Sequence, residues 1–464
     1  MKPVHLLSRN KHFVMAALSI VMAHVSYSKL TVPAIATYFG TKCRYEDVNL
    51  HLRDDILFVN KSLMGPPSAA CKAVHLVAVL RHGTRYPTAK NIRKLASLYD
   101  LVMAEASGPA WWLEGIKSNW TMWYTEDMDG KLVTKGKEDH RHLAIRLAKT
   151  FPTLMSRDNL LGERIEFLTS SKHRCVDSVK AFQEGLHQHL DVRGLGFTHY
   201  VNDSLMRFFD QCQRFVEDVE NSKTALKEVE IFKTSVEMEG VRRKMASRLQ
   251  IPHSLITSGY FKNLVEAAFF LCSYELAIKS ENSLWCNTLD EVDAEVLEYK
   301  NDLKQYWKRG YGYDINRKSS CSLFHDLFRR LEEASHYYRL GKATKAATVQ
   351  VGHAETLLPL LSLMGFFRDK TPLTAENFSV QRGRKFRTSQ LVPYAANLLF
   401  VLYECRDELR LQFFLNEKPV QFPSMGHPAP LYDTVRAHYS KLLQGCDFNK
   451  ECELPKVNHM NTEL

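Results

Sequence analysis

The stretch Ala73-Val74-His75-Leu76-Val77-Ala78-Val79-Leu80-Arg81-His82-Gly83-Thr84-Arg85-Tyr86-Pro87 decides the fold. Its first eight residues are mostly β-branched or aliphatic, and the glycine shortly after them predicts a buried strand that ends in a turn. The strand runs directly into two arginines and a histidine, although charged side chains are rarely buried without a partner. We therefore expect an anion at the end of this strand. Two guanidiniums can hold a phosphate by paired hydrogen bonds, and the histidine between them could attack it.

Three further apolar segments predict strands of the same sheet, at residues 164–170, 346–351 and 398–403. Helical periodicity separates these strands, over residues 90–106, 138–150, 176–190 and in a segment that ends near Leu361. Strands that alternate with helices predict an α/β sheet covered by helices on both faces. From about 195 to 335, apolar residues recur every three or four positions and strand-like alternation is absent, which predicts a mostly helical insertion.

Ionisable side chains follow three of the predicted strands at the point where each strand ends. They are Arg81, His82 and Arg85 after the first strand, Lys172, His173 and Arg174 after the second, and His353 and Glu355 after the third. In open α/β sheets, ligands bind at the carboxyl ends of the strands, and helices that begin there point partial positive charge at an anion. A lone histidine after a strand is more often structural, whereas this combination predicts a phosphate pocket.

The segment Arg81 to Pro87, with the distant His353, resembles the histidine acid phosphatase branch of the phosphoglycerate-mutase-like superfamily. Most acid phosphatases and phytases of that branch carry His-Asp, whereas this chain has His353-Ala354-Glu355, which is similar to the multiple inositol polyphosphate phosphatases. Residues 171–178, 206–210 and 307–313 also resemble that family, so the resemblance covers nearly the whole chain after its first residues.

The resemblance implies a phosphoglycerate-mutase-like α/β sheet core, flanked by helices, with an inserted and mostly helical cap. We predict four segments: a signal peptide at 1–28, the first part of the core at 29–194, the cap at 195–335, and the second part of the core at 336–464.

The resemblance also implies a role for each residue of the pocket. His82 would take the phosphoryl group as a phosphohistidine, and the phosphate would be held by Arg81, Arg85, Arg174 and His353. Glu355 would protonate the leaving alkoxide and then activate water. Chemistry supports an acid here, because an inositol alkoxide leaves poorly and a positioned acid contributes about 10²–10⁴-fold. Nearby arginines disfavour another cation on His82, so activity is expected to extend to acidic pH. In the structural alternative, Glu355 only stabilises the start of the following helix.

The substrate that the resemblance implies is an inositol polyphosphate such as phytate, with 2,3-bisphosphoglycerate as a possible second substrate that loses its 3-phosphate. A heavily phosphorylated substrate needs positive charge beyond the catalytic pocket. The candidates are Lys135, Lys137, His140, His142, Lys308, Arg309, Lys172 and His173. We single out Lys172 and His173 because they adjoin Arg174, although solvated surface residues are the alternative for all of them.

Two other functions stay open. One is a histidine acid phosphatase of broad specificity for simple monoesters, and the other is a non-catalytic polyanion-binding protein of the same fold. A mutase is disfavoured, because a water-exposed phosphoenzyme would hydrolyse before it could pass its phosphoryl group back. The mechanism requires no metal or other cofactor, and no spacing of His, Asp and Glu demands a metal.

Composition restricts the class of protein and of partner. The chain has 464 residues, is 45% hydrophobic and 25% charged, and is therefore an ordinary globular protein rather than a disordered or multi-span membrane protein. Its net charge of +10 suits an anionic ligand, but also nucleic acid or acidic membrane. Together with the motifs, we predict a small polyanionic substrate, no nucleic acid and no stable membrane span; the sequence gives no oligomeric state.

The first 28 residues have the pattern of a secretory signal. A basic start is followed by an apolar run of 11 residues from Phe13 to Ala23 and by small residues near Ser26. That run is shorter than the about 20 residues that span a bilayer, so a cleaved leader is favoured over a short anchor. The chain ends in Glu463-Leu464, part of an endoplasmic reticulum retention signal, and we expect a protein that is secreted or kept in that lumen.

Ten cysteines and four acceptor sequons agree with an oxidising compartment. No two cysteines form a Cys-x-x-Cys pair, which disfavours a zinc or redox motif. The cysteines allow many pairings, and proximity in the chain suggests Cys446 with Cys452 and Cys272 with Cys286. The sequons begin at Asn60, Asn119, Asn202 and Asn377.

Overall fold

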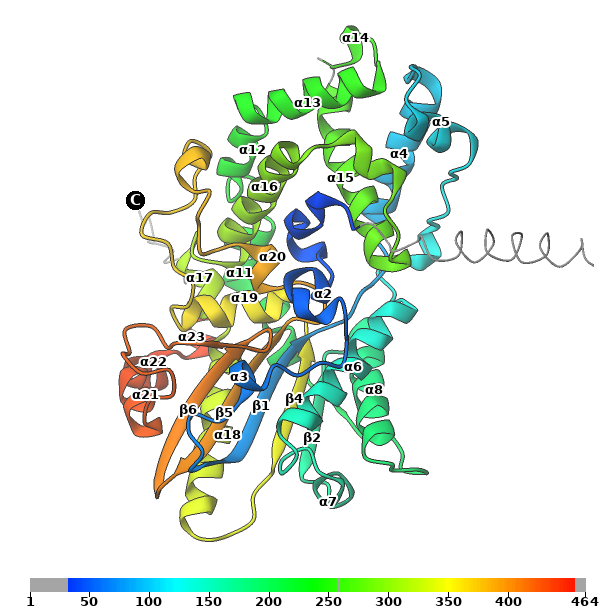
Figure 1. Cartoon of the computed structure of the whole chain (residues 1–464). Coiled ribbons are helices and arrows are strands. Elements are labelled where there is room, and N and C mark those ends of the chain that lie inside the picture. The colour runs from blue at the N-terminus through cyan, green and yellow to red at the C-terminus, as the bar shows by residue number, and fades with distance from the viewer. Residues whose placement is uncertain (1–31, 257–258, 455–464) are drawn as a thin grey trace, which may run out of the picture.

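A seven-stranded mixed sheet lies at the centre of the structure, a computed structural model that describes residues 32–256 and 259–454 (Figure 1). In spatial order its strands are β3 (Tyr200–Val201), β2 (Ile165–Thr169), β4 (Ala347–Gly352), β1 (Cys71–Arg81), β5 (Asn397–Cys405), β6 (Glu408–Leu415) and β7 (Lys418–Val420). Strands β3, β2, β4 and β1 run parallel, whereas β5, β6 and β7 continue the sheet as antiparallel neighbours. The α/β fold class and the four predicted strands are therefore confirmed.

Strands β6, β7 and β3 have no counterpart in the sequence prediction. The turns that follow β5 and β6 place two successive residues at positive φ, Arg406-Asp407 in one and Asn416-Glu417 in the other. Tight hairpin turns of this kind usually carry Asn-Gly or Asp-Gly, which is the sequence signal that reveals them. Neither turn contains a glycine, so the signal is missing. Strand β3 is only two residues long.

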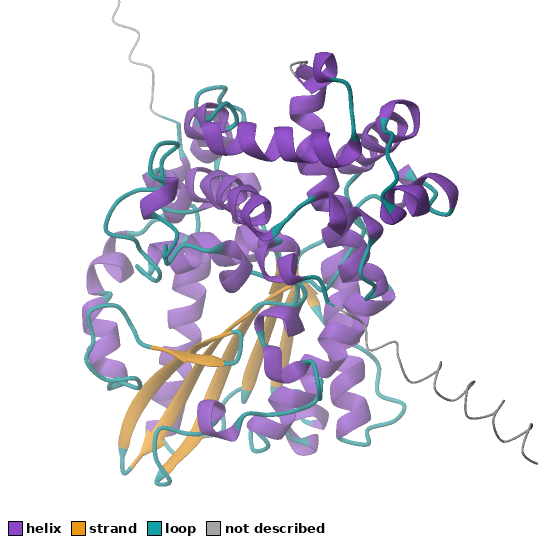
Figure 2. Ribbon diagram, turned by 45° about the horizontal axis from the view of Figure 1, so that its top comes forward, coloured by secondary structure: helices purple, strands orange, loops and turns teal. Residues whose placement is uncertain are grey.

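Helices cover both faces of the sheet, as predicted (Figure 2). On one face, α6 (Thr134–Thr150) packs against α8 (His173–His189), and both bury their apolar sides over Leu76, Ala78 and Leu80 of β1. On the other face, α18 (Cys321–Arg339) and α19 (Ala354–Leu363) cover Val77 and Val79. Because both faces of β1 are buried, its sequence is continuously apolar instead of alternating.

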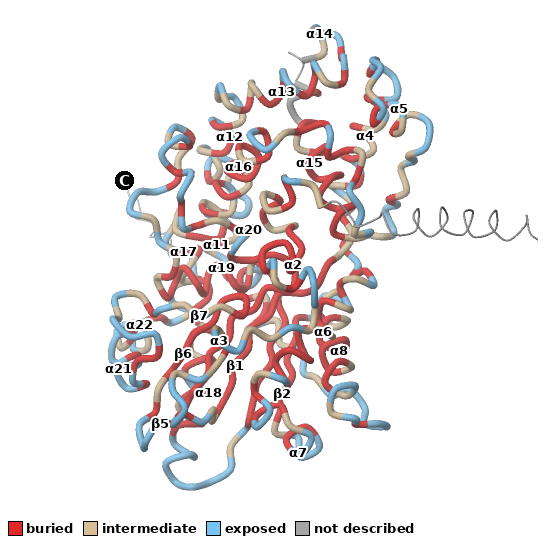
Figure 3. The backbone as a smooth tube through the Cα atoms, viewed as in Figure 1, coloured by how far each residue is buried: buried red, intermediate tan, exposed pale blue. Residues whose placement is uncertain are grey.

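A second group of helices lies beyond the carboxyl ends of the parallel strands (Figure 1). It includes α12 (Lys227–Phe232), α13 (Val236–Leu249), α14 (His253–Ile256), α15 (Gly259–Lys279) and α16 (Glu291–Arg309). Helices α4 (Ala89–Glu105) and α5 (Trp111–Ser118) join this group, because α4 packs on α15 and α5 packs on η6 (Leu284–Thr288). Buried residues continue from the sheet into these helices, so the two regions share one hydrophobic core (Figure 3).

Four disulfides connect distant parts of the chain: Cys71–Cys405, Cys212–Cys452, Cys272–Cys286 and Cys321–Cys446. The predicted Cys272–Cys286 pair is confirmed. The predicted Cys446–Cys452 pair is wrong, because each of these cysteines instead links the C-terminal segment to a different helical region. Cys71 and Cys405 face each other in the ladder between β1 and β5. Cys43 and Cys175 are buried and reduced.

The predicted signal peptide and the Glu463-Leu464 ending lie outside the described residues. Within residues 32–256 and 259–454, no helix combines the length and apolar character needed to cross a membrane.

Candidate active site

The carboxyl ends of β1, β4 and β2 lie next to one another, and the predicted site residues follow them. Arg81 pairs with Gly352 across the β1–β4 ladder, and the His82 amide donates to the Gly352 carbonyl at 3.0 Å. The Ser170 amide, just beyond β2, donates to the Val351 carbonyl at 3.1 Å. Sheet register therefore brings together three segments that lie almost 300 residues apart in the sequence.

His82 is buried, and its tautomer follows from one contact. Its Nδ1 lies 2.9 Å from the Gly83 carbonyl oxygen, which can only accept a hydrogen bond. Nδ1 therefore carries the proton, and Nε2 keeps its lone pair. Burial, together with Arg81, Arg174 and Arg85, holds the pKa of His82 well below its usual value. The ring is therefore neutral even in acid, and its predicted role as the nucleophile stays a prediction.

Three guanidiniums surround this histidine. The Nε atoms of Arg81, Arg85 and Arg174 are buried and have no hydrogen-bond partner among the described residues, and none of these arginines forms an ion pair there. Two hydrogen bonds to the backbone hold the Arg81 guanidinium in place, because its Nη1 donates to the carbonyls of Thr41 and Val392, each at 2.6 Å. Burial lowers the pKa of Arg81 to about 10. Buried donors without partners are costly, so an anion at this place would supply the hydrogen-bond acceptors that these three arginines lack.

His353 faces His82, with 5.7 Å between the two ring centroids. Arg174 Nη2 lies 3.3 Å from its Nδ1, and Ser170 Oγ lies 2.9 Å from its Nε2. A guanidinium can only donate, so Nδ1 accepts and Nε2 carries the proton that Ser170 receives. Burial and Arg174 lower the pKa of His353 to about 3. The ring is thus neutral and fixed in place, and its predicted contact with phosphate stays a prediction.

Glu355 lies in the first turn of α19, beside the two histidines. Burial opposes its ionisation, but the charge of Arg309, with Arg81 and a backbone hydrogen bond acting in the same direction, outweighs burial and lowers the pKa of Glu355 to about 2. Arg309 is the last residue of α16 and reaches the site from the helical region beyond the sheet. A bound phosphate dianion would offset these positive charges and shift the carboxyl toward its protonated form. Glu355 can therefore change its protonation with the occupancy of the site.

Lys172 and His173, the predicted additional contacts, are exposed at the start of α8 and adjoin Arg174. The other cationic candidates are mostly held by the protein itself. Lys135 forms ion pairs with Asp139 and Glu46, and His140 Nε2 lies 3.0 Å from the Arg81 carbonyl.

Lys308 and Arg309, the candidate substrate contacts in the helical region, also form ion pairs within the protein. Glu220 binds Lys308 at 2.6 Å and Arg309 at 2.9 Å. Arg309 nevertheless reaches Glu355 electrostatically.

Sequence reasoning missed two residues of the site. The Tyr394 ring lies 4.7 Å from the Arg81 guanidinium and 6.3 Å from the His82 ring. Lys42 places its Nζ 3.8 Å from the centroid of the Phe270 ring. Burial lowers the pKa of Lys42 to about 7, and Arg85 and Arg81 act in the same direction. No motif surrounds Tyr394 or Lys42, so only tertiary structure reveals them.

Two glycines allow the loop after β1 to pack directly on α6. A Cβ at Gly83 would lie 2.1 Å from the Gly136 carbonyl oxygen, and a Cβ at Gly136 would lie 2.0 Å from the Thr84 carbonyl oxygen. The approach is fixed by Asp139 of α6, whose Oδ2 accepts from the Thr84 amide at 3.0 Å and from its hydroxyl at 2.7 Å. Helix α6 therefore determines the position of His82.

These groups together suit phosphoryl transfer through a histidine. A neutral nucleophile, three cations for the charge that develops on phosphate, and a carboxyl group for proton transfer are its requirements. Among the described residues, no three His, Cys, Asp or Glu side chains lie where they could hold a metal ion.

Comparison with known proteins agrees with this geometry. Residues 74–416 match the histidine phosphatase superfamily (branch 2). The chain is 46% identical to multiple inositol polyphosphate phosphatase 1 of Homo sapiens, over 93% of this chain and 92% of that protein. It is 48% identical to the Gallus gallus protein of that name, over 91% and 93%.

Solved structures show the same fold. The phytase from D. castellii superposes with a TM-score of 0.71 at 15% identity, covering 92% of this chain and 91% of that one. The multiple inositol polyphosphate phosphatase of Bifidobacterium longum, in complex with inositol hexasulfate, gives 0.66 at 14% identity, covering 83% and 93%. The chain thus belongs to branch 2 of the histidine phosphatase superfamily, within the family of the multiple inositol polyphosphate phosphatases.

Proposed function

We propose that this protein is a phosphomonoesterase that removes phosphates from inositol polyphosphates through a phosphohistidine. One observation carries the proposal. The unprotonated Nε2 of His82 lies among three arginines whose buried Nε atoms have no partner in the described part of the chain. Two relatives that are 46% and 48% identical to this chain bear the name of a multiple inositol polyphosphate phosphatase, which supports this substrate class.

In the first half-reaction, Nε2 of His82 attacks phosphorus and the bond from phosphorus to the ester oxygen breaks. Glu355 gives its proton to the departing alkoxide, while Arg81, Arg85 and Arg174 offset the charge on the phosphoryl oxygens. In the second half-reaction, the Glu355 carboxylate takes a proton from water as the water oxygen attacks phosphorus. The bond from phosphorus to Nε2 breaks, and inorganic phosphate leaves.

The charge around the pocket favours a polyphosphorylated substrate over a simple monoester. Lys42 stands close to Arg85 and Arg81, and its ammonium has no carboxylate within ion-pair distance among the described residues. The nearby carboxylate, Glu266, is paired with Lys300 at 3.1 Å. A neighbouring phosphate on the ring of the substrate would give Lys42 a partner. A phosphatase of broad specificity remains the alternative.

Three variants test the proposal, with phosphate release from inositol hexakisphosphate as the assay. We expect His82→Ala to abolish turnover, because the variant lacks the Nε2 that attacks phosphorus in this mechanism. Glu355→Gln should lower kcat by about 10²–10⁴-fold on inositol hexakisphosphate. With p-nitrophenyl phosphate, which has a good leaving group, Glu355→Gln should give a burst of product and trap a phosphoenzyme.

Controls separate catalysis from folding and from substrate preference. His189→Ala changes an exposed histidine at the end of α8 and should leave turnover unchanged. Lys42→Gln should reduce kcat/KM for inositol hexakisphosphate by about tenfold and change it little for p-nitrophenyl phosphate. Near wild-type turnover by folded His82→Ala would overturn the mechanism, and equal losses on both substrates would favour broad specificity. The same assay tests 2,3-bisphosphoglycerate, which stays a prediction.

We also propose that the protein enters the secretory pathway and is secreted or retained in the endoplasmic reticulum lumen. The four disulfides support this compartment, because disulfides persist in oxidising surroundings. Tagged protein that stays in the cytosol with reduced cysteines would contradict it.

A further inference from the structure

A cavity of about 660 Å³ opens at the end of the sheet opposite to His82. It is lined by the start of β1, the end of β5, Ala346 before β4, the segment 150–154 after α6, and the end of α18. The last residue of β1 in the lining is Val74, seven residues before Arg81, so at about 3.3 Å per residue the strand separates this cavity from the phosphate pocket by about 23 Å. None of the residues around His82 lines it.

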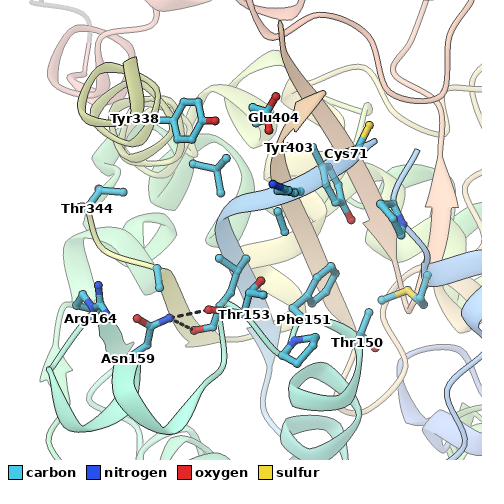
Figure 4. A pocket seen from close by; sticks show the side chains of 18 of the residues that line it. Cys71, Thr150, Phe151, Thr153, Asn159, Arg164, Tyr338, Thr344, Tyr403 and Glu404 are labelled. Atoms are coloured by element: carbon cyan, nitrogen blue, oxygen red, sulfur yellow. Dashed lines mark hydrogen bonds between the residues drawn. The ribbon is translucent and has the colours of Figure 1, made fainter. Parts of the chain in front are cut away.

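The cavity has apolar walls and one buried hydroxyl group. Phe151, Leu154, Met64 and Pro66 supply apolar surface. Figure 4 shows Tyr403 between Tyr338 and Glu404 on one side and Phe151, Thr153 and Asn159 on the other. Tyr403 is only 2% exposed, and its hydroxyl has no hydrogen-bond partner among the described residues. A buried hydroxyl normally forms a hydrogen bond. A ligand atom that accepts from the Tyr403 hydroxyl would therefore offset the free-energy cost of burying it unpaired.

Cations border the same cavity. Lys72, Arg164 and Lys342 all line it, and none of their side chains forms an ion pair or hydrogen bond in the part of the chain that the structure describes. The carboxylate in the lining, Glu404, accepts from the Asp407 amide at 2.9 Å. Positive charge therefore exceeds negative charge around a largely apolar space.

We propose that this cavity binds a small amphipathic carboxylate. Its apolar body would cover the walls around Phe151, and a carboxylate oxygen would accept from the Tyr403 hydroxyl. Lys72, Arg164 and Lys342 would offset the negative charge. An inositol phosphate does not fit, because it has no apolar surface for these walls and its dense charge would lose hydration against them. The site is thus distinct from the catalytic pocket in place and in chemistry.

Octanoate is a suitable probe, measured by isothermal titration calorimetry with the intact, disulfide-bonded protein. We expect one site with a dissociation constant on the order of 0.1–1 mM, as for other ligands of this size. Acetate lacks the apolar body and 1-octanol lacks the charge, so both should bind at least about tenfold more weakly. Inositol hexakisphosphate should not displace octanoate, because the two sites lie at opposite ends of the sheet.

Variants locate the bound carboxylate. Tyr403→Phe removes only the hydroxyl, and Arg164→Gln removes one cation; each should weaken octanoate about tenfold. Lys345→Gln is the matched control, since Lys345 is close in the chain but lies outside the lining and donates to the Glu163 carbonyl at 2.8 Å. It should bind octanoate normally. All three variants should retain full phosphatase activity.

Thr153→Trp provides a second route if Tyr403→Phe folds poorly. Thr153 is exposed at the edge of the cavity, so an indole there should fill the space and abolish octanoate binding without disturbing the core. Absence of octanoate binding, equal binding of 1-octanol, displacement by inositol hexakisphosphate, or unchanged affinity in both Thr153→Trp and Arg164→Gln would each overturn the proposal.

Discussion

In the proposed mechanism, Glu355 donates a proton in one half of the reaction and accepts one in the other, so the cations near it would set the pH at which both steps work. In the substrate-free site, burial is outweighed by the charge of Arg309, with Arg81 acting in the same direction, and the pKa of Glu355 is lowered to about 2. Catalysis at higher pH therefore depends on the charge that substrate brings. The protein has placed the carboxyl group where substrate binding itself shifts the proton equilibrium.

Arg309→Gln tests this dependence. Removing a cation raises the pKa of Glu355, so both the acidic and the alkaline limb of the kcat profile should move to higher pH. On the alkaline limb, kcat should rise about threefold or more, because more of the enzyme carries the proton that the alkoxide needs. The measurement is kcat against pH with inositol hexakisphosphate at saturation.

Lys308→Gln is the control for this change. Lys308 also binds Glu220, at 2.6 Å, but it is not among the groups with the largest effect on the pKa of Glu355. The dependence of kcat on pH in Lys308→Gln should match that of the unchanged protein. Identical shifts in both variants would mean that loss of the Glu220 contacts, and not the charge at Glu355, alters the profile.

Single residues were predictable from sequence where a motif marks them. Arg81, His82 and Arg85 sit in one short string, and strand ends brought Arg174, His353 and Glu355 to the same place. Tyr394 and Lys42 lie in irregular segments and enter the site only through tertiary packing. The sequence marks Arg309 as a candidate for charge beyond the pocket, but its electrostatic effect on Glu355 depends on how α16 lies over the sheet.

At the scale of elements, the buried strands were the easiest to predict, because β1 and β4 are apolar on both faces. The hairpin strands were missed because their turns reach positive φ without glycine, as in Arg406-Asp407. Helix α6 begins at Thr134, ahead of the residue 138 at which the periodicity predicts its start. Its first turn holds Lys135 and Gly136, which serve the loop around His82 rather than the apolar core.

The packing of α6 on that loop gives a pair of glycine predictions with opposite signs. In Gly136→Ala the new Cβ would meet the Thr84 carbonyl at 2.0 Å, so the helix must shift, at a cost of about 1–3 kcal/mol, and kcat should fall. Gly240→Ala, within α13, meets nothing within 4 Å and should stabilise the protein by about 0.5–1 kcal/mol with unchanged kcat. Denaturant unfolding and steady-state kinetics check both. Full activity in Gly136→Ala would show that α6 does not position His82.

At the scale of the whole molecule, proximity in the chain is a poor guide to which cysteines form disulfides. Cys446 and Cys452 are close in sequence, yet they bond to Cys321 and Cys212 and thereby attach the C-terminal segment to two separate helical regions. Short disulfide loops such as Cys272–Cys286 can be guessed from spacing, whereas long-range pairs require the positions of helices in space. The same limit applies to the cap, because α4 precedes the predicted insertion and still packs on α15.

The asparagines of the sequons differ in whether their side chains are exposed or form hydrogen bonds within the folded protein. Asn119 is exposed at the end of α5. The Asn377 Oδ1 accepts from the Tyr299 hydroxyl at 2.7 Å and from the Thr374 amide at 2.9 Å, while its Nδ2 donates to the Pro372 carbonyl at 2.8 Å. A glycan on Asn377 would compete with these contacts, whereas a glycan on Asn119 would point into solvent.

We therefore expect protein made in a secretory host to carry a glycan at Asn119 and none at Asn377, as measured by mass spectrometry of peptides before and after enzymatic deglycosylation. Asn119→Gln should remove one glycan and leave phosphatase activity unchanged. Asn377→Gln should lose about 1–3 kcal/mol of stability even in protein made without glycans, because the half-buried Thr374 amide loses its acceptor and the contacts with the Tyr299 hydroxyl and the exposed Pro372 carbonyl are also lost. Occupancy at Asn377 in active protein would contradict the structural argument. Absence of glycan at every sequon would instead count against entry into the secretory pathway, so the two parts of the prediction fail in different ways.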